Sequence, residues 1–434
     1  MEVTIIGGGL AGCEAAWRLA RAGLTVRLFE MRPEKMTPAH QTGLLSELVC
    51  SNSLKADAVT NASGLLKAEM ELLDSLVMRA ARATAVPAGA ALAVDRERFA
   101  KRMTEAVQAL PGVEIAREEV SAVPAAGTVI IASGPLTSDA LAADIARLTA
   151  ADGLFFYDAI APVVFAQSVD MRVAFRASRY GKGGGDDYIN CPLSREEYEA
   201  FVDALLAGAK TAPRAFEELK VFEGCLPIEV MAERGRETPA HGPMKPVGLV
   251  DPRTGKRPHA VAQLRQDNAE ATLYNMVGFQ TRLRRPEQER VFRMIPGLGR
   301  AEFARLGSIH RNTFIHSPRL LSSDLSLRSE PRVLFAGQIT GVEGYLESAA
   351  MGIIAGLNAA RQVQGKGPAV PPPTTMTGAL IAYITDSARE DFQPMNANFG
   401  ILAPLNAAVK KSARKQAMVD RALADMKTWR EIVS

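Results

Sequence analysis

The sequence predicts an α/β fold with a discontinuous first domain and an inserted α+β domain. Two observations carry this prediction: a strand–glycine turn–helix unit occupies residues 3–29, and a second such unit occupies residues 332–363. Because units of this kind assemble into one parallel sheet, the long segment between them is expected to be an insertion. The expected boundaries are 1–165 and 310–404 for the discontinuous domain, 166–309 for the insertion and 405–434 for a basic helical tail.

The first unit, EVTIIGGGLAGCEAAWRLARAGLTVRLFE, has the pattern of a dinucleotide-binding turn. Its expected elements are a strand, a helix and a second strand, at residues 3–6, 11–22 and 24–29. Gly7, Gly9 and Gly12 form GxGxxG, which is weak evidence alone but specific between a strand and a helix. Glu30 follows the second strand, close to the spacing of roughly 20 residues at which a carboxylate accepts the ribose hydroxyls. The unit therefore predicts a Rossmann-like domain.

Two later units extend this domain. Residues 127–148 predict a strand, a glycine turn and a helix. Residues 332–363 predict a strand, a turn that includes Gly337 and Gly344, and a helix rich in Ala and Gly. A late strand and helix start usually closes over the long flavin dinucleotide, so this distal unit favours FAD over NAD. An ordinary closing βα unit remains the alternative.

The composition is that of an ordinary globular protein, with 47% apolar and 23% charged residues among 434. A net charge of +3 provides no global basic field, so any nucleic acid must bind to a local patch. The four cysteines form no CxxC pair, which argues against a disulfide framework and against a zinc site. No stretch approaches the ~18 apolar residues of a membrane span. We expect a cytoplasmic protein with no metal and no membrane association.

The middle and the tail contain two further segments of interest. The loop RYGKGGGDDY, residues 179–188, holds three consecutive glycines and is expected to be a surface loop, with a lid as the alternative. Residues 410–434 hold seven Lys or Arg against three Asp or Glu, and their apolar residues recur on one helical stripe. We expect a docked amphipathic helix rather than an RNA-contacting tail. The stripe consists of Met418, Ala422, Met426, Trp429 and Val433.

The cysteines are the main candidates for chemistry. Cys13 lies among alanines on the first helix, and Cys191 precedes a proline; both are expected to be core residues. Cys50 precedes Ser-Asn-Ser, residue types that cap helices, and a helix start there would lower the pKa of its thiol. Cys225 follows Gly224, which allows another molecule to approach the backbone. For Cys50 and Cys225 a buried apolar thiol is an equal alternative.

Histidine and arginine residues supply candidate ligand contacts. His310 is accompanied by Arg311, His316 and Arg319, and such a cluster before the late strand would lie near a ligand that spans both domains. A loop histidine with ordinary hydrogen bonds is the alternative. A second group, of five arginine residues, is suited either to phosphate contacts or to a solvated helix face. It consists of Arg282, Arg284, Arg285, Arg290 and Arg293.

Several long strings match a known family. They are GGGLAGCEAAW, FEMRPEKMTPAH, LVCSNSL, VPAGAALAVDR, GPMKPVGLVDPRTGK, QLRQDN, HRNTF, AGQITGVEGYLESAAMG and FQPMNANFG. On these strings the chain resembles the folate- and FAD-dependent tRNA (uracil-5-)-methyltransferase family, known as TrmFO, from residue 1 to about residue 404. The related GidA-type tRNA-modifying flavoproteins share the Rossmann start and an early cysteine.

The resemblance implies formation of 5-methyluridine in the tRNA T-loop, at position 54 of the tRNA. The carbon would come from 5,10-methylenetetrahydrofolate and be reduced by FADH2, with NADH or NADPH as reductant. Cys225 matches the nucleophile that adds to uracil C6, Cys50 a second cysteine near the flavin, and His310 a histidine that stacks on the folate. The FAD contacts would be Gly7, Gly9, Leu10, Ala11, Gly12, Glu30, Gly337, Gln338, Gly344 and Tyr345.

The resemblance also implies a tRNA partner, bound through residues 282–293 and 410–415 as expected phosphate contacts. Two other functions remain compatible with the residues. One is a different flavin enzyme, either a GidA-like tRNA modifier or a small-molecule FAD oxidoreductase. The other is a flavin-binding, RNA-associated protein without catalysis.

Overall fold

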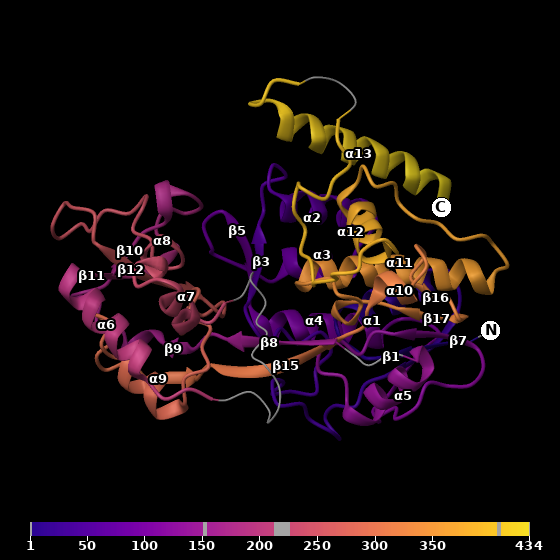
Figure 1. Cartoon of the computed structure of the whole chain (residues 1–434), viewed down its shortest axis with the longest axis horizontal. Helices are drawn as coiled ribbons and strands as arrows, with labels where there is room; N and C mark the ends of the chain where they lie inside the picture. The colour runs from indigo at the N-terminus through magenta and orange to yellow at the C-terminus, as the bar shows by residue number, and fades with distance from the viewer. Residues whose placement is uncertain (1, 151–153, 212–225, 406–408, 434) are drawn as a thin grey trace.

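The computed structural model describes residues 2–150, 154–211, 226–405 and 409–433, which form two lobes joined by a two-stranded ribbon (Figure 1). The ribbon pairs β8 (Leu154–Ile160) with β15 (Ser308–Phe314) in antiparallel register, with His310 opposite Asp158. β8 carries the chain from the first lobe into the second, and β15 brings it back. Each lobe has its own six-stranded sheet, and the buried residues of the second lobe form a separate hydrophobic cluster.

The sheet of the first lobe combines strands from distant parts of the sequence, and its core is parallel. In spatial order its strands are β16 (Ser326–Leu327), β17 (Glu330–Phe335), β7 (Thr128–Ile131), β1 (Glu2–Ile6), β2 (Thr25–Phe29) and β6 (Val113–Ala116). Only β16 runs antiparallel to its neighbour. The α/β class is confirmed, and the strands and helix expected between residues 3 and 29 begin and end within one residue of the observed elements.

Helices cover this sheet, and two of them pack unusually closely on each other. They are α1 (Leu10–Arg21), which follows β1, and α11 (Tyr345–Val363), which follows β17; α5 (Asp139–Thr149) follows β7. A side chain at Gly352 would overlap the backbone of Ala11, and one at Gly356 would come within 2.8 Å of Ala15 Cα. The glycines therefore let α11 approach α1 at backbone distance, which holds the late unit against the early one.

A smaller antiparallel sheet and further helices complete the first lobe. Its strands are β3 (Ser53–Ala56), β4 (Ala85–Val86) and β5 (Ala91–Val94). The helices are α2 (Ala62–Leu72), α3 (Leu76–Ala83), α4 (Arg96–Gln108), α10 (Ser317–Leu320) and α12 (Met376–Thr385). The residues directly after β6 and the turn η4 (Gln338–Thr340) line a cavity described below.

The second lobe is an antiparallel sheet with helices packed against it. In spatial order its strands are β10 (Phe175–Arg176), β11 (Tyr188–Leu193), β12 (Ala260–Gln266), β13 (Leu273–Met276), β9 (Val163–Phe165) and β14 (Phe303–Arg305). Its helices are α6 (Arg195–Ala207), α7 (Ile228–Arg234), α8 (Thr238–His241) and α9 (Arg285–Phe292), with short turns η1 (Ala166–Ser168) and η2 (Arg179–Gly181). Segregated strands and helices of this kind are typical of an α+β lobe.

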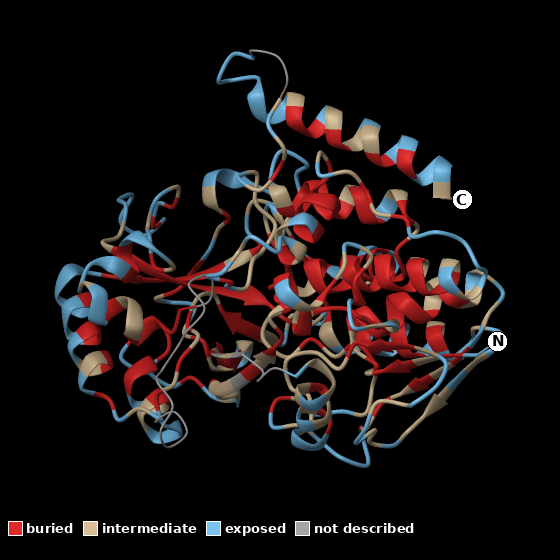
Figure 2. Ribbon diagram, turned by 45° about the vertical axis from the view of Figure 1, so that its right-hand side comes forward, coloured by how far each residue is buried: buried red, intermediate tan, exposed pale blue. Residues whose placement is uncertain are grey.

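The tail forms α13 (Arg414–Val433), which lies across the outside of the first lobe (Figure 1). Met418, Ala422, Met426 and Trp429 are buried, and Figure 2 shows the buried face of this helix turned toward the lobe. The predicted amphipathic docking is confirmed. Val433, the last residue of the predicted stripe, is only half-buried because it lies at the helix end.

A buried carboxylate joins two helices of the first lobe. Glu69 on α2 accepts hydrogen bonds from the backbone N–H of Met376 at 2.6 Å and of Thr377 at 2.8 Å, at the start of α12. The Thr377 hydroxyl also donates to it, at 2.8 Å. Burial raises the pKa of Glu69 to about 7 even though these donors favour the charged form.

We predict that Glu69→Ala lowers the free energy of unfolding by roughly 2–4 kcal/mol, because two buried N–H groups lose their acceptor. The midpoint of urea unfolding measures the loss. Glu71→Ala on the same helix is the matched control: its exposed carboxylate pairs with Arg82 and should contribute less than about 1 kcal/mol. Equal losses in the two variants would contradict the role given to Glu69.

Candidate functional site

The turn between β1 and α1 forms the floor of a cavity at the carboxyl edge of the sheet. Gly7 has φ +110, and a side chain there would collide with the backbone of Ala132. A side chain at Gly12 would overlap the carbonyl oxygen of Gly7. Gly9 differs, because a Cβ at this position would meet no atom within 4 Å. The protein itself needs Gly7 and Gly12, whereas the small size of Gly9 leaves space for a ligand.

The predicted acidic residue lies in the same cavity. Glu30 is buried, and its carboxylate accepts hydrogen bonds from Gly8 N at 3.1 Å and from Arg32 Nε at 2.9 Å and Nη2 at 3.0 Å. Burial alone would raise the pKa of Glu30, but the hydrogen bonds and charge of Arg32 outweigh it and hold the pKa below its usual value. Glu30 is therefore ionised at neutral pH, as an acceptor for ribose hydroxyls must be.

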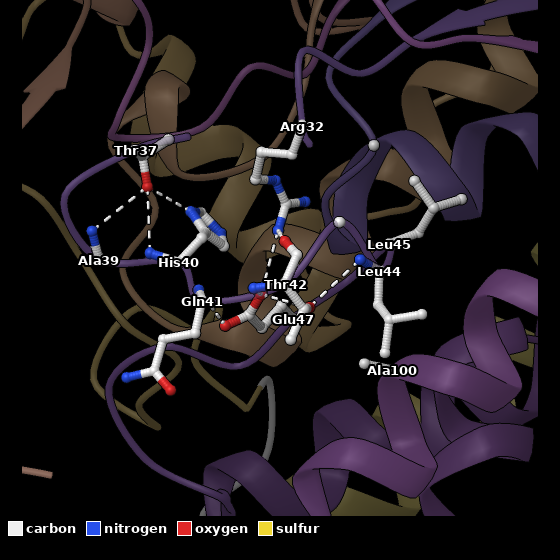
Figure 3. Close-up of polar contacts among 12 residues, drawn as sticks. Arg32, Thr37, Ala39, His40, Gln41, Thr42, Leu44, Leu45, Glu47 and Ala100 are labelled. Atoms are coloured by element: carbon white, nitrogen blue, oxygen red, sulfur yellow. Dashed lines mark hydrogen bonds and ion pairs between the residues drawn. The ribbon is translucent and has the colours of Figure 1, made fainter. Parts of the chain in front are cut away.

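The segment after Glu30 forms one wall of the cavity and is shown in Figure 3. Glu47 accepts hydrogen bonds from the backbone N–H of Gln41 and Thr42 and contacts Arg32 at 3.3 Å. The Thr37 hydroxyl lies 2.6 Å from His40 Nδ1. Burial, and then the charge of Arg32, lowers the pKa of His40 to about 4, so its ring is neutral at pH 7.

Sequence reasoning missed this wall. Arg32, Thr37, His40 and Glu47 all line the cavity. The string FEMRPEKMTPAH was noticed only as a family signature, yet it holds an arginine two residues after the acidic strand end. Such an arginine could have been predicted to pair with Glu30.

A second cavity, of about 240 Å³, brings together predicted site residues from distant parts of the chain. Cys50, His310, Gln338, Gly344 and Tyr345 all line it. It adjoins the first cavity, to which Gly337, Gln338, Leu10 and Ala11 also contribute. The residues that line both are Val49, Pro135, Leu136, Gln338 and Tyr345. A ligand bound over the glycine turn could therefore extend toward Cys50.

Tyr345, at the start of α11, holds the cysteine loop in place. Its hydroxyl accepts hydrogen bonds from Cys50 N at 2.8 Å and Ser51 N at 3.2 Å. Burial, and then the neighbouring Cys50, raises the pKa of the phenol, so the hydroxyl stays protonated. The close packing of α11 on α1 thus sets the position of Cys50 as well.

Of the two alternatives for Cys50, the structure contradicts the thiol at a helix start with a lowered pKa. Asn52 Nδ2 donates to the carbonyl oxygens of Val94 at 2.9 Å and Gln266 at 2.8 Å, and the chain continues as strand β3. Burial, and then the charge of Asp158, raises the pKa of Cys50 to about 12. The thiol is thus held protonated, with Ala159 O as acceptor at 3.8 Å.

His310 points into the second cavity from the ribbon. Its Nε2 lies 2.8 Å from Ser308 Oγ, and burial, and then the charge of Arg305, lowers the pKa of its ring. The cluster expected around it does not form with His316, whose ring packs on Phe392 at 5.5 Å and does not line either cavity. β15 ends at Phe314 and His316 stands at the start of α10, so sequence proximity did not bring these side chains together.

Two carboxyl groups to which the sequence assigned no role, Asp158 and Glu343, also face the second cavity. Burial raises the pKa of Asp158 to about 7. Burial, and then the charge of Asp158, raises the pKa of Glu343 well above its usual value, and Gln338 Nε2 donates to Glu343 at 2.6 Å. The pair therefore carries a proton at neutral pH. Asp158 had a signal in the sequence, since it is the charged residue in the apolar string LFFYDAIAPVVF.

The other predicted residues divide as follows. Cys13 and Cys191 are buried core thiols whose pKa burial raises to about 12, as expected. Cys225 lies outside the described residues. Of the arginine group, Arg282 pairs with Glu229 at 3.8 Å and Glu233 at 3.6 Å, so its charge is neutralised within the protein.

Within the described ranges, no cluster of His, Cys, Asp and Glu has the form of a metal site. None of the described helices combines the length and apolar character that a membrane span requires. The site is therefore defined by the two cavities and by the residues that line them.

The fold and the glycine turn define the class of α/β proteins with a ligand cavity at the carboxyl edge of a parallel sheet. Comparison with known proteins narrows this class. The family described as "Glucose inhibited division protein A" matches residues 2–367. Two solved structures of Aquifex aeolicus GidA share the fold, with TM-scores of 0.72 and 0.71 at 16% and 17% identity; this chain is covered completely, and those chains to 73% and 76%.

Closer relatives carry a more specific name. The chain is 60% identical over 427 residues to the methylenetetrahydrofolate–tRNA-(uracil-5-)-methyltransferase TrmFO of Geobacter sulfurreducens, covering 98% of both proteins. It is 57% identical to the protein of that name from Moorella thermoacetica, covering 97% of both. The chain therefore belongs to the TrmFO family, within the broader GidA family.

The environment of Cys50 predicts how its thiol reacts. Alkylation by iodoacetamide should be slow at pH 8 and should rise with pH without a plateau below about pH 11, because burial and Asp158 raise the thiol pKa to about 12. Asp158→Asn should accelerate alkylation at pH 9, because it removes the negative charge that opposes thiolate formation. Peptide mass spectrometry measures the rate at Cys50.

Asp391→Asn is the control, since this exposed carboxylate does not line the cavity and should leave the rate unchanged. Rapid alkylation of the wild-type thiol at pH 7, or no acceleration in Asp158→Asn, would contradict the electrostatic account.

Proposed function

We propose that this protein forms 5-methyluridine at position 54, in the T-loop of tRNA, with the carbon taken from 5,10-methylenetetrahydrofolate. The observation that carries the proposal is the continuity of the two cavities, which places a dinucleotide cradle beside Cys50, His310 and Tyr345. Relatives that are 56–60% identical to this chain are named for this activity, and the similarity extends over nearly their full length. Because tRNA is its substrate, we propose the cytoplasm as its location.

FAD fits the first cavity. The space over Gly9, the first-turn N–H groups of α1 and the ionised carboxylate of Glu30 suit a pyrophosphate and a ribose. When bound, reduced FAD would supply the two electrons that convert the folate methylene carbon to a methyl group. NADH or NADPH would be the source of these electrons. The proposed contacts that line the cavities are Gly7, Gly9, Leu10, Ala11, Glu30, Gly337, Gln338, Gly344 and Tyr345. Gly12, the remaining predicted contact, lines neither cavity and lets α1 pack against the glycine turn.

We assign this FAD-binding domain to residues 1–165 and 310–404, as a discontinuous Rossmann-like unit. Strands from both parts share one sheet, in which β17 of the late part pairs in parallel with β7 of the early part, and this supports the assignment. Residues 166–309 form the proposed inserted substrate domain, and 405–434 the basic helical tail. His310, on the ribbon between the lobes and facing the second cavity, is proposed to stack on the folate ring.

The reaction requires a thiolate that adds to uracil C6 and thereby makes C5 nucleophilic. We propose Cys225 for this role, from its Gly-Cys context and the family resemblance. The raised pKa of Cys50 supports this choice, because a thiol protonated at neutral pH is a poor attacking group without a base. Cys50 is then the second cysteine, at the junction of the two cavities.

The carboxyl pair supplies proton transfer in this proposal. After the new carbon–carbon bond forms, the proton on C5 of the uracil must leave before the thiolate is expelled. At neutral pH at least one of the two carboxyl groups is protonated, and the other, when ionised, is suited to accept a proton. Their position in the cavity of Cys50 and His310 supports this assignment.

The reaction itself can be tested with folate labelled at the methylene carbon, NADPH and unmodified tRNA. We expect label in the methyl group of the T-loop uridine. Cys225→Ala should abolish it and retain the flavin, whereas Cys191→Ala, in the core of the second lobe, should keep the activity. No label on that uridine, or label on a different nucleotide, would favour a GidA-like or oxidoreductase function instead.

The FAD cradle can be tested with the two glycines that differ in their surroundings. Gly9→Ala should sharply reduce the flavin content of the purified protein and leave the unfolding midpoint of the flavin-free protein unchanged, because its Cβ meets only ligand space. Gly12→Ala should lower both, since its Cβ would overlap Gly7. Normal flavin content in Gly9→Ala would contradict the proposed position of the dinucleotide.

A further inference from the structure

The string GPMKPVGLVDPRTGK has no part in either cavity, although it distinguishes this chain from generic flavoproteins. It forms a long loop of the second lobe that lies against the loop RYGKGGGDDY. Tyr180 N donates to Gly248 O at 3.0 Å, and Arg179 Nη1 donates to Val247 O at 2.8 Å. The two loops thus form one surface, which we call the Tyr180 surface: residues 179–186 and 243–257.

Tyr180 is held in an unusual backbone conformation on this surface. Its φ is +57 and its ψ 26, a left-handed conformation that costs a non-glycine residue about 1 kcal/mol or more. One edge of its ring covers Gly248, where an added Cβ would lie 2.9–3.0 Å from three ring atoms. Despite this support the residue is 69% exposed. The backbone of Tyr180 is therefore strained although its aromatic ring is exposed to solvent.

The loop that carries Tyr180 is anchored at its base. The Asp187 carboxylate accepts hydrogen bonds from Gly184 N at 3.2 Å and from Gly89 N, in the first lobe, at 2.6 Å. Ser178 N donates to Gly185 O at 2.6 Å. The glycine-rich loop is therefore a tethered support for the ring, so a ligand that binds there would lose little loop entropy.

The exposed residues of the Tyr180 surface are apolar and cationic. Val247 and Val250 are 43% and 57% exposed. The one carboxylate of the longer loop, Asp251, is buried and already paired with Arg253 at 2.7 Å. Four exposed cations on the two loops form no ion pair among the described residues. The two loops hold only one exposed carboxylate within the described residues, that of Asp186. These cations are Lys182, Lys245, Lys256 and Arg257.

We propose that the Tyr180 surface binds an unpaired segment of the RNA substrate, with one base stacked on the Tyr180 ring and the adjoining phosphates on the four cations. An exposed aromatic ring and unpaired cations on one surface are the combination with which proteins bind single-stranded RNA. A purely apolar protein partner would leave those charges unmatched. The inference rests on the proposed function, which supplies the RNA, and adds a contact that is separate from the two cavities.

The test compares Tyr180→Ala with Tyr180→Phe, which keeps the ring. Fluorescence anisotropy with unmodified tRNA should show binding weakened about tenfold in Tyr180→Ala and unchanged in Tyr180→Phe. The double variant Lys256→Gln/Arg257→Gln should lower the slope of log Kd against log salt by about one to two, whereas Tyr180→Ala should not change the slope. Flavin content and reduction by NADPH without tRNA should be normal in all variants, which excludes misfolding as the cause.

The outcomes separate this inference from the proposed function. If wild-type protein binds and methylates tRNA and Tyr180→Ala binds equally well, the inference is overturned and the function stands. If Tyr180→Phe is as weak as Tyr180→Ala, the stacking contact is overturned. If wild-type protein binds no tRNA, the proposed function is overturned, and so is the inference that the Tyr180 surface binds RNA.

Discussion

The close packing of α11 on α1 is the contact on which the arrangement of the site depends. Gly352 and Gly356 allow the two helices to meet at backbone distance. The packing fixes the start of α11, and there Tyr345 accepts the N–H groups of Cys50 and Ser51. Segments about 300 residues apart in the chain are thereby held against one cavity. A larger side chain at either glycine would separate the glycine turn from the cysteine loop.

Burial without full neutralisation dominates the electrostatics of the second cavity. It holds Cys50 protonated and raises the pKa values of both Asp158 and Glu343. In the first cavity the effect of burial on the pKa is outweighed, because Arg32 keeps Glu30 ionised. Groups of the same type thus carry different charges in adjoining cavities, according to whether an arginine or another carboxyl group is the neighbour. This difference suits a site in which one part binds a cofactor and the other transfers protons.

The two-stranded ribbon connects the second lobe to the second cavity. β8 and β15 cross between the lobes side by side and carry Asp158 and His310 opposite each other (Figure 1). Any ligand that contacts these residues is bordered by both lobes. The second lobe can therefore carry a substrate contact, such as the Tyr180 surface, without altering the sheet that holds the cofactor.

The sequence by itself determined the elements whose signals are local. The strand–turn–helix at 3–29, the late βα unit and the amphipathic tail were all predictable, because hydrophobic period and glycine spacing depend on near neighbours. The family membership was also predictable from long strings. Only the tertiary structure decided the chemistry of the side chains. Asn52 directs the chain after Cys50 into a strand by bonding to residues from both lobes, and the charge of Asp158 reaches Cys50 across the cavity. A pKa and a hydrogen-bond partner depend on what is close in space, and residue spacing along the chain does not contain that information.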